Sequence, residues 1–395
     1  MTIRVEDVLD GKVRIPPVNP EMIRNMRDNW DRIAKPIGSF GQFEQLHGRI
    51  AAIQGTSRSN PDYAIREVSR TDSGHTIQDA SSSDSGCEIQ EISGPDLNHM
   101  RLLVCCGDHG IVEEGVSQSP QNVTAVCAEN IGKGVSTAGI LAKAAGAEIR
   151  AIDVGINQPG PVPGTEYRRV ANGTKNFLRE PAMTKQELRQ ALQVGMNLAE
   201  ESRMDGITLL GIGEMGIGNT TSAAVLTGKM LGLTAEEVTG RGAGLDAAGM
   251  QRKLEVVRQA LAESEVVGGT EFIFGRYGGL ELAAMSGIII GSACCGIPVI
   301  LDGVLSMASA LAAERLAPGC REYLIPSHMS REPAAERLAA ALRLEPVIDG
   351  AMATGEGAGA ALMMSVLRAV DCVYREAERF DGYGIAEYTR YEEVE

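Results

Sequence analysis

The stretch Gly211-Ile-Gly-Glu-Met-Gly-Ile-Gly-Asn-Thr-Thr221 decides how this chain can be folded. Residues 207–210 before it are typical of a short buried strand, and residues 222–226 after it are helix formers. The glycines are therefore expected in a turn from a strand into a helix. Such a turn gathers free backbone N–H groups at the positive end of a helix dipole, which suits a bound phosphate.

The same alternation of strand and helix continues on both sides of this turn. Strands are expected at 102–106, 148–155, 207–211, 298–302 and 322–327, and helices at 123–145, 184–202, 246–264, 281–295, 306–316, 333–344 and 359–378. This order predicts an α/β fold with a doubly wound, mostly parallel, Rossmann-like sheet. Ligands of such sheets bind at the carboxyl ends of the strands. The polar residues expected at those ends are Asp108, His109, Asp153, Glu214, Asp302 and His328.

The composition excludes several classes of protein. The chain has 395 residues and a formal charge of −15, which argues against a non-specific nucleic-acid or anionic-membrane surface. Glycines, serines and Pro298 interrupt the longest apolar stretch, 283–301, so no membrane span is expected. No signal peptide and no C-x-x-C pair is found, and a cytoplasmic protein with reduced thiols is predicted. Residues 55–98 are polar and lack periodicity, which predicts an inserted, partly mobile loop.

The glycine spacing leaves two kinds of nucleotide site to compare. Gly211-x-Gly-x-x-Gly216 formally matches a dinucleotide fingerprint, but the acidic residue required at the end of the next strand is missing. The next acids, Glu236 and Glu237, are expected at the start of a helix. A mononucleotide phosphate fits better, because Gly218-Asn-Thr-Thr221 adds side-chain donors at the helix start.

Two further glycine turns carry charged residues. Gly240–Gly244 permits close approach of the backbone to a ligand, and Lys253 can add a charge to the same phosphate or be an ordinary surface lysine. Glu356 stands between two glycines before a helix. Apolar surroundings would raise its pKa and make it a base near neutral pH; alternatively, it only complements the helix dipole.

Four residues at the strand ends carry groups suited to a metal ion. They are Asp108, His109, Asp302 and His328, but no recognisable ligand spacing relates them. Hydrogen-bonded polar residues that line a cleft are the preferred interpretation, and no metal is predicted.

Long and unusual motifs in this chain resemble one family. They are Asp108-His-Gly-Ile-Val112, Glu114-Gly-Val-Ser117, Pro120-x-x-Val-Thr124, Gly173-Thr-Lys-Asn176, Glu180-Pro-Ala-Met183, Gly213-Glu-Met-Gly-Ile-Gly-Asn-Thr-Thr221, Gly240-Arg-Gly-x-Gly-Leu-Asp246 and Gly355-Glu-Gly-x-Gly359. Together they resemble the nicotinate-nucleotide–dimethylbenzimidazole phosphoribosyltransferases of cobalamin lower-ligand synthesis, from about Lys35 to Val370. The resemblance implies transfer of phosphoribose from nicotinate mononucleotide to an aromatic base, without a cofactor.

The resemblance also implies domains and residue roles. It implies a homodimer, an α/β phosphoribosyl-binding domain over 99–344, and a small helical domain from residues 1–54 and about 345–395. Glu356 would be the catalytic base, and Ser119 and Thr354 would lie at the aromatic base. The phosphate and ribose would be held by Glu214, Gly216, Gly218, Asn219, Thr220, Gly242 and Lys253.

Two positions depart from the family pattern. Thr354 and Phe40 stand where leucine is usual, and Thr354 can alter the base pocket. Dimethylbenzimidazole is therefore the default acceptor, and a purine, another benzimidazole or a phenol stays open. Two other functions are kept as alternatives: a metal-dependent hydrolase at the strand ends, and a non-catalytic nucleotide-binding subunit of a heteromer.

Overall fold

A computed structural model describes residues 3–59, 93–263 and 269–390 of the chain. In these residues a parallel sheet of six strands has the order β3-β2-β1-β4-β5-β6. The strands are β1 (Met100–Gly107), β2 (Glu148–Gly155), β3 (Thr165–Tyr167), β4 (Leu209–Met215), β5 (Val299–Ile300) and β6 (Leu324–Ile325). This order confirms the doubly wound α/β fold, although β5 and β6 are shorter than the sequence predicted.

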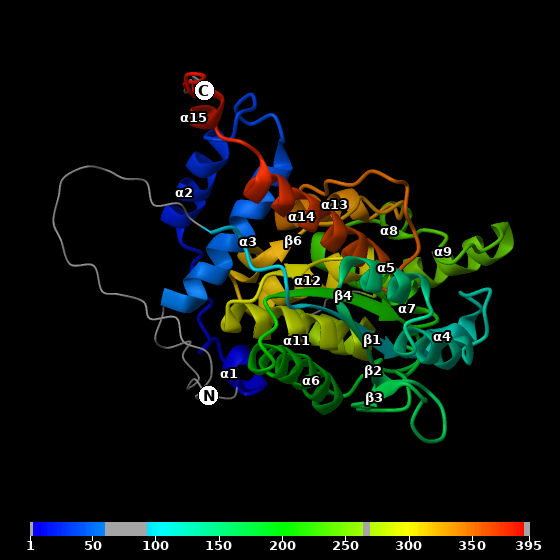
Figure 1. The fold of residues 1–395 in the computed structure, drawn as a ribbon. Helices are drawn as coiled ribbons and strands as arrows, with labels where there is room; N and C mark the ends of the chain where they lie inside the picture. The colour runs from blue at the N-terminus through cyan, green and yellow to red at the C-terminus, as the bar shows by residue number, and fades with distance from the viewer. Residues whose placement is uncertain (1–2, 60–92, 264–268, 391–395) are drawn as a thin grey trace.

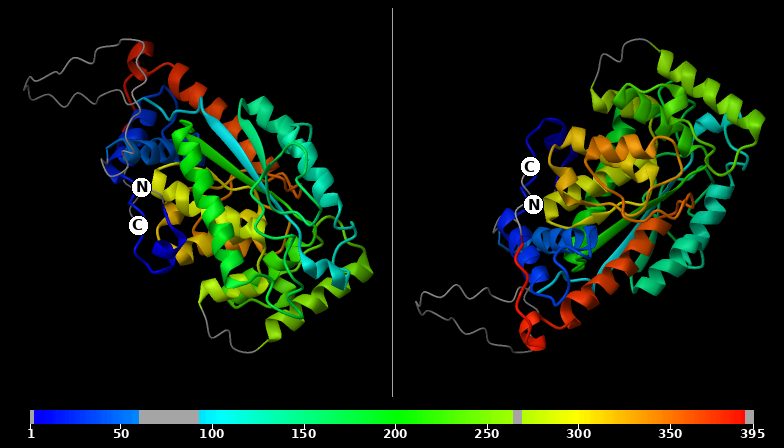
Figure 2. Two further views of the ribbon diagram at one scale, coloured as in Figure 1. Left: turned by 90° about the horizontal axis from the view of Figure 1, so that it is seen from below. Right: turned by 90° about the horizontal axis from the view of Figure 1, so that it is seen from above.

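Helices cover both faces of the sheet (Figures 1 and 2). The central strand β1 is buried along its whole length, and its residues alternate between two cores. Leu103 and Cys105 pack toward one helical layer, and Leu102 and Val104 toward the other. The first layer contains α6 (Lys185–Met204), α7 (Asn219–Leu231), α10 (Thr270–Tyr277), α11 (Leu280–Cys295) and α12 (Val304–Leu316). The second contains α3 (Gln42–Ser59), α4 (Val123–Gly132), α5 (Thr137–Ala145) and α14 (Ala358–Glu376).

The remaining helices of the described chain lie outside these two lists. They are α1 (Val5–Leu9), α2 (Pro20–Asp31), η2 (Gly110–Glu114), α8 (Ala235–Val238), α9 (Ala247–Ala262), η3 (Cys320–Tyr323), α13 (Ala335–Leu342) and α15 (Phe380–Tyr383). The acidic pair Glu236 and Glu237 lies in the first turn of α8, where Thr234 and Glu237 form a capping box, so the expected helix start is present. None of the helices in the described ranges is both long and apolar enough to cross a membrane.

The predicted helix over 123–145 is in fact two helices. α4 ends at Gly132, and Gly134 takes a positive φ of 69°. The Ser136 hydroxyl then accepts a hydrogen bond from Gly139 N (3.2 Å) and caps the start of α5. The prediction was wrong because the apolar spacing continues across the break, while the capping signals at its centre are local.

Segments from the two halves of the chain pack together beside the sheet, namely α2 and α3 from the N-terminal part and α14 from the C-terminal part (Figure 1). A separate apolar cluster joins α2, α3 and the end of α14; its buried members are Met26, Trp30, Ile33, Ala51, Val370 and Tyr374. By contrast, α1 lies on α6, where Gln193 accepts from Val5 N (2.9 Å). The division into domains at residues 54 and 345 stays a prediction. Helix α3 continues through Ser59 into the predicted loop 55–98, of which residues 60–92 lie outside the described residues.

Candidate active site

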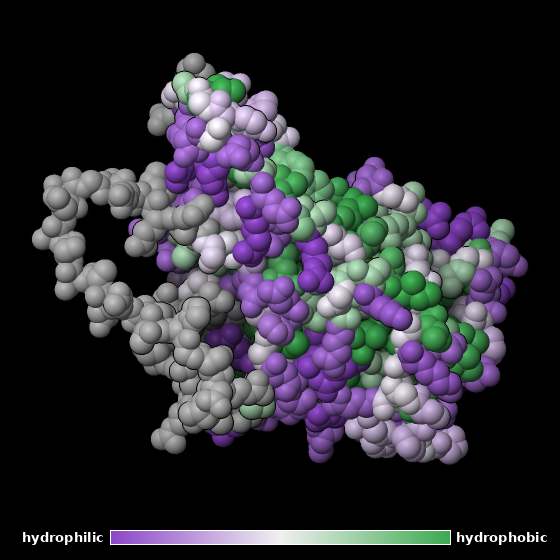
Figure 3. Space-filling model, in the orientation of Figure 1, coloured by the Kyte–Doolittle hydropathy of each residue, from purple (hydrophilic) through white to green (hydrophobic). Residues whose placement is uncertain are grey.

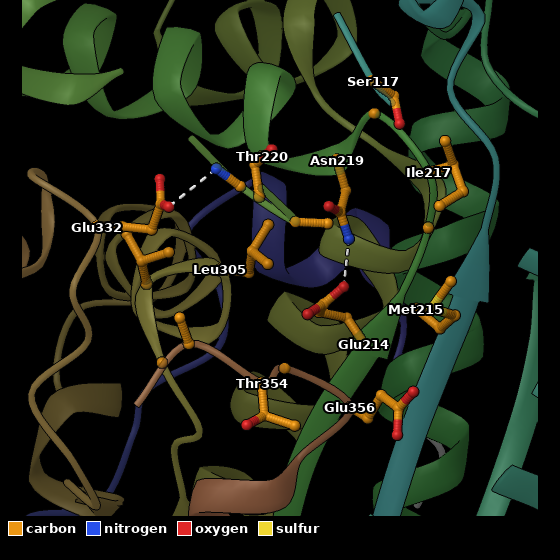
Figure 4. Close-up of a pocket in the computed structure, with 18 of the residues that line it drawn as sticks. Ser117, Glu214, Met215, Ile217, Asn219, Thr220, Leu305, Glu332, Thr354 and Glu356 are labelled. Atoms are coloured by element: carbon orange, nitrogen blue, oxygen red, sulfur yellow. Dashed lines mark hydrogen bonds between the residues drawn. The ribbon is translucent and has the colours of Figure 1, made fainter. Parts of the chain in front are cut away.

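A cavity of about 300 Å³ opens at the carboxyl ends of β4 and β5, next to β1. The winding direction of the sheet changes between β1 and β4, and such a switch point is where open α/β sheets bind ligands. The walls come from segments far apart in the sequence: residues 116–127, 214–220, 241–245, 302–305, 328–332 and 353–356. Figure 4 shows Thr220 and Glu332 at one end, Met215, Ile217 and Glu356 at the other, and Glu214 with Asn219 between them.

The first glycine loop is shorter than the sequence predicted. Strand β4 continues to Met215, so Gly211 and Gly213 belong to the strand and the turn begins at Gly216. A Cβ atom on Gly213 would lie 2.4 Å from the backbone nitrogen of Gly357. The glycine at this position is therefore needed for packing against a distant segment. Gly218, with a φ of 97°, is the N-cap of α7, where the strand-to-helix turn was expected.

Several N–H groups of this turn already have partners. Asn219 N donates to Gly216 O (3.2 Å) and Thr221 N donates to Gly218 O (3.1 Å). Ile217 N donates to the Thr124 hydroxyl (3.1 Å). The expected set of free backbone donors is thus reduced, and the side chains of Asn219 and Thr220, which line the cavity, become more important for binding an anion.

Lys253 joins the second glycine loop to the first. Its side chain is fully buried, and its Nζ donates to Thr220 Oγ1 (2.8 Å) and to Gly240 O (2.9 Å). Burial lowers the Lys253 pKa to about 8, against the opposing effect of Glu332. Because the Thr220 oxygen accepts from Lys253, its own proton can be donated to a ligand. The interpretation of Lys253 as an ordinary surface lysine is therefore wrong.

Carboxyl groups crowd the middle of the cavity. Glu214 accepts a hydrogen bond from the Asn219 amide. Burial, followed by the nearby charges of Asp302 and Glu281, raises the Glu214 pKa well above its usual value. Asp302 lies beside the start of α14 and accepts from Gly359 N (2.7 Å) and Gly357 N (3.2 Å). Asp302 thereby fixes the turn that carries Glu356.

Glu356 has a strained backbone. Its φ is 60°, and it lies between Gly355 (72°) and Gly357 (84°), both also in the left-handed region. A non-glycine residue in this region costs about 1–3 kcal/mol, and such strain clusters at functional sites. Burial and the charge of Asp302 raise the Glu356 pKa, and a hydrogen bond with the Ser136 side chain opposes that shift. A carboxylate with a raised pKa that lines a cavity can take a proton from a ligand near neutral pH.

The two residues predicted to contact the aromatic base line the same cavity as Glu356. Ser119 and Thr354 both line the cavity, as expected for contacts with a base. Cys127 and Met215 line it as well, and sequence reasoning did not single them out. Cys127 lies on α4, outside every glycine motif, so no spacing in the sequence indicated it. Burial and the nearby charge of Glu356 raise the pKa of its thiol.

The four residues considered for a metal site have other partners. Asp108 accepts from the Thr124 hydroxyl (2.6 Å) and from Asn157 N (2.8 Å). The buried His109 ring contacts Glu281 Oε1 (2.7 Å) on α11, away from the cavity. Of these four residues, Asp302 and His328 line the cavity, and Asp108 and His109 do not. Within the described residues, no group of three or more His, Cys, Asp or Glu is arranged to hold a metal ion.

A Rossmann-like sheet with glycine loops around one cavity, and a buried lysine behind Thr220, defines a class of α/β proteins that bind phosphate-bearing ligands. A family model described as phosphoribosyltransferase matches residues 15–85 and 83–385. A nicotinate-nucleotide–dimethylbenzimidazole phosphoribosyltransferase of Escherichia coli (strain ATCC 8739) is 35% identical over 362 residues, 91% of each chain. The enzyme of the same name from Escherichia coli O17:K52:H18 is 36% identical over the same length.

Solved structures agree with these relatives. The crystal structure of CobT from Thermus thermophilus superposes with a TM-score of 0.78 at 35% identity, and covers 93% of this chain and all of that one. A second structure from the same organism, titled as the nicotinate-nucleotide–dimethylbenzimidazole phosphoribosyltransferase, gives a TM-score of 0.78 at 34% identity and covers 94% of this chain. The chain belongs to the family of nicotinate-nucleotide–dimethylbenzimidazole phosphoribosyltransferases.

Proposed function

We propose that this protein transfers phosphoribose from nicotinate mononucleotide to a ring nitrogen of an aromatic base. The default acceptor is 5,6-dimethylbenzimidazole, and the products are an α-ribazole 5′-phosphate and nicotinate, for the nucleotide loop of cobalamin. The names of the relatives support this activity. The observation that carries the proposal is one cavity with anion-binding groups at one end and the strained Glu356 at the other.

The donor nucleotide would be held at the glycine loops. Thr220 and Lys253, joined by a 2.8 Å hydrogen bond, would bind the 5′-phosphate together with the backbone at Gly216, Gly218 and Gly242. Asn219 and Glu214, which lie between the two ends of the cavity, would hydrogen-bond the ribose hydroxyls. This arrangement fixes both ends of the phosphoribose and leaves its C1 atom toward Glu356. Fixed positions of this kind supply a large part of the rate acceleration in two-substrate reactions.

The chemistry then needs only a proton acceptor. The acceptor nitrogen attacks C1 of the ribose while the bond from C1 to the pyridinium nitrogen breaks. The electron pair of that bond stays on the departing ring, which leaves neutral at nitrogen and requires no general acid. The Glu356 carboxylate takes the N–H proton of the attacking azole. Attack opposite the leaving ring inverts C1, so a β-linked donor gives an α-linked product. General-base catalysis of this kind contributes roughly 10²- to 10⁴-fold in rate.

The acceptor pocket lies where Ser119 and Thr354 line the cavity, with Cys127 and Met215. Thr354 is exposed to the cavity and offers a hydroxyl where leucine is usual in the family. A panel of dimethylbenzimidazole, other benzimidazoles, purines and phenols, each incubated with nicotinate mononucleotide and analysed by mass, identifies the preferred acceptor. The variant Thr354→Leu tests whether that hydroxyl sets the preference.

The active unit is proposed to be a homodimer. Val126, Val135 and Ile140, on and between α4 and α5, are large apolar side chains that are more than half exposed. Figure 3 shows apolar residues gathered over the face where α4, α5 and α14 lie. Light scattering of the purified chain tests the assembly, and cell fractionation tests the cytoplasmic location expected from the sequence.

The experiment for the proposed activity uses the purified single chain with nicotinate mononucleotide and dimethylbenzimidazole. Formation of nicotinate and an α-ribotide in equal amounts, unaffected by a chelator, is the expected result. Activity only in the presence of another subunit would favour the heteromer alternative. Phosphate or base release by hydrolysis, lost with a chelator, would favour the metal-dependent hydrolase.

A further inference from the structure

A carboxylate already lies against the glycine loop where the phosphate would bind. Glu332, in the loop between β6 and α13, accepts a hydrogen bond from Gly242 N (3.0 Å; Figure 4). It lines the cavity and is half-buried. A Cβ atom on Gly240 would lie 2.0 Å from its second carboxylate oxygen, so the carboxylate is pressed onto the backbone of the loop. This acid was not among the residues that the sequence motifs indicated.

The same small region contains the other donors of the proposed phosphate site. The Thr220 hydroxyl oxygen is 2.9 Å, and the Lys253 ammonium 3.4 Å, from the position of a Cβ atom on Gly242. Within the described residues, no lysine, arginine or histidine nitrogen pairs with Glu332 inside 4.0 Å. The carboxylate is held by the N–H group that a phosphate oxygen would use, and the charge of Lys253 attracts it from beyond ion-pair distance. Two anions on these donors repel each other strongly, because the site is partly shielded from water.

We propose that Glu332 is an internal competitor for the phosphate site. Its carboxylate occupies Gly242 N–H in the free enzyme and must be displaced when a phosphate-bearing ligand binds. The inference rests on the proposed function, since it needs the 5′-phosphate at this loop. Glu332 thereby lowers the affinity of the site for phosphate-bearing ligands such as nicotinate mononucleotide.

The test measures binding by calorimetry with three ligands: inorganic phosphate, nicotinate mononucleotide, and nicotinate riboside, which lacks the phosphate. Glu332→Gln keeps the side-chain length and an acceptor oxygen for Gly242 N–H but removes the charge. It is expected to bind inorganic phosphate and the mononucleotide about tenfold more tightly. The affinity for nicotinate riboside is expected to stay unchanged. Glu336→Gln removes the same charge from an exposed position on α13 and serves as the matched control.

Two further variants separate the possible failures. Lys253→Met is expected to weaken phosphate binding; if it leaves phosphate affinity unchanged, the phosphate does not bind here and the proposed site is wrong. If Lys253→Met weakens binding while Glu332→Gln binds as the wild type does or more weakly, only the competitor role is overturned. Should Glu332→Gln not fold, Glu332→Asp keeps the charge but withdraws it from Gly242, and tighter phosphate binding is again expected. Unchanged binding of that variant also overturns the inference.

Discussion

Replacing Gly213 by alanine should disturb Glu356, which is 143 positions further along the chain. The added Cβ would lie 2.4 Å from Gly357 N, which is 0.6 Å closer than the 3.0 Å below which Cβ contacts are essentially not seen. The atoms that the new Cβ meets, in Gly357 and Glu356, all belong to the backbone, so the turn that carries Glu356 has to move. A displacement approaching 1 Å at a reacting group costs up to about 10²-fold in rate. Overpacking of this kind also costs about 1–3 kcal/mol of stability.

The assay combines steady-state kinetics with nicotinate mononucleotide and dimethylbenzimidazole, calorimetric binding of the mononucleotide, and urea unfolding. We expect a roughly 10- to 100-fold loss of kcat with mononucleotide affinity nearly kept, since the glycine loops stay in place. Gly211→Ala is the control in the same strand. Its Cβ would meet the flexible end of Met364 at 2.8 Å, so it should lose far less activity. Wild-type kcat in folded Gly213→Ala would refute the reasoning.

Two further predictions concern pH. Lys253, with a pKa of about 8, binds phosphate best when protonated, so the affinity for nicotinate mononucleotide in calorimetry should fall roughly tenfold between about pH 7 and about pH 9. Lys253→Met should abolish that pH dependence. A pH-independent affinity of the wild type would contradict this role of Lys253. His47 is fully buried, accepts from Trp30 Nε1 (3.3 Å), and has its pKa lowered by burial against the pull of Asp371. The folded state therefore binds this proton less well than the unfolded state, so the free energy of unfolding should fall as pH drops below about 6.5. Urea titrations followed by the fluorescence of Trp30, the single tryptophan of the chain, measure the free energy of unfolding at each pH. A free energy of unfolding that does not decline between about pH 7 and about pH 5.5 would contradict the prediction.

Local signals allowed much of the fold to be predicted from the sequence. Helix α6 begins where Thr184 and Glu187 form the expected capping box, and β2 has the predicted bounds. The order of strands and helices was enough to predict a parallel, doubly wound sheet. Where a local signal competed with a longer apolar pattern, as at Gly134 and Ser136, the helix break was missed.

The site was predictable only where a charged or hydroxyl-bearing residue stands in or near a glycine-rich motif. Glu356, Thr220 and Lys253 were singled out, and the structure brings Glu356 and Thr220 to one cavity with Lys253 bonded behind Thr220. The packing of Gly213 against Gly357 depends on a contact between distant segments, and no spacing along the chain indicates it. The same holds for Glu332, which reaches Gly242 from 90 positions away.

The central claim is that Glu356 takes the proton of the attacking base while other residues hold the donor. Glu356→Gln tests it most directly, because the amide keeps the size of the side chain and cannot accept that proton. We predict that nicotinate release with dimethylbenzimidazole falls by at least about 10²-fold, while the dissociation constant of nicotinate mononucleotide changes little. Near-normal turnover of this variant, with the mononucleotide bound as in the wild type, would contradict the account.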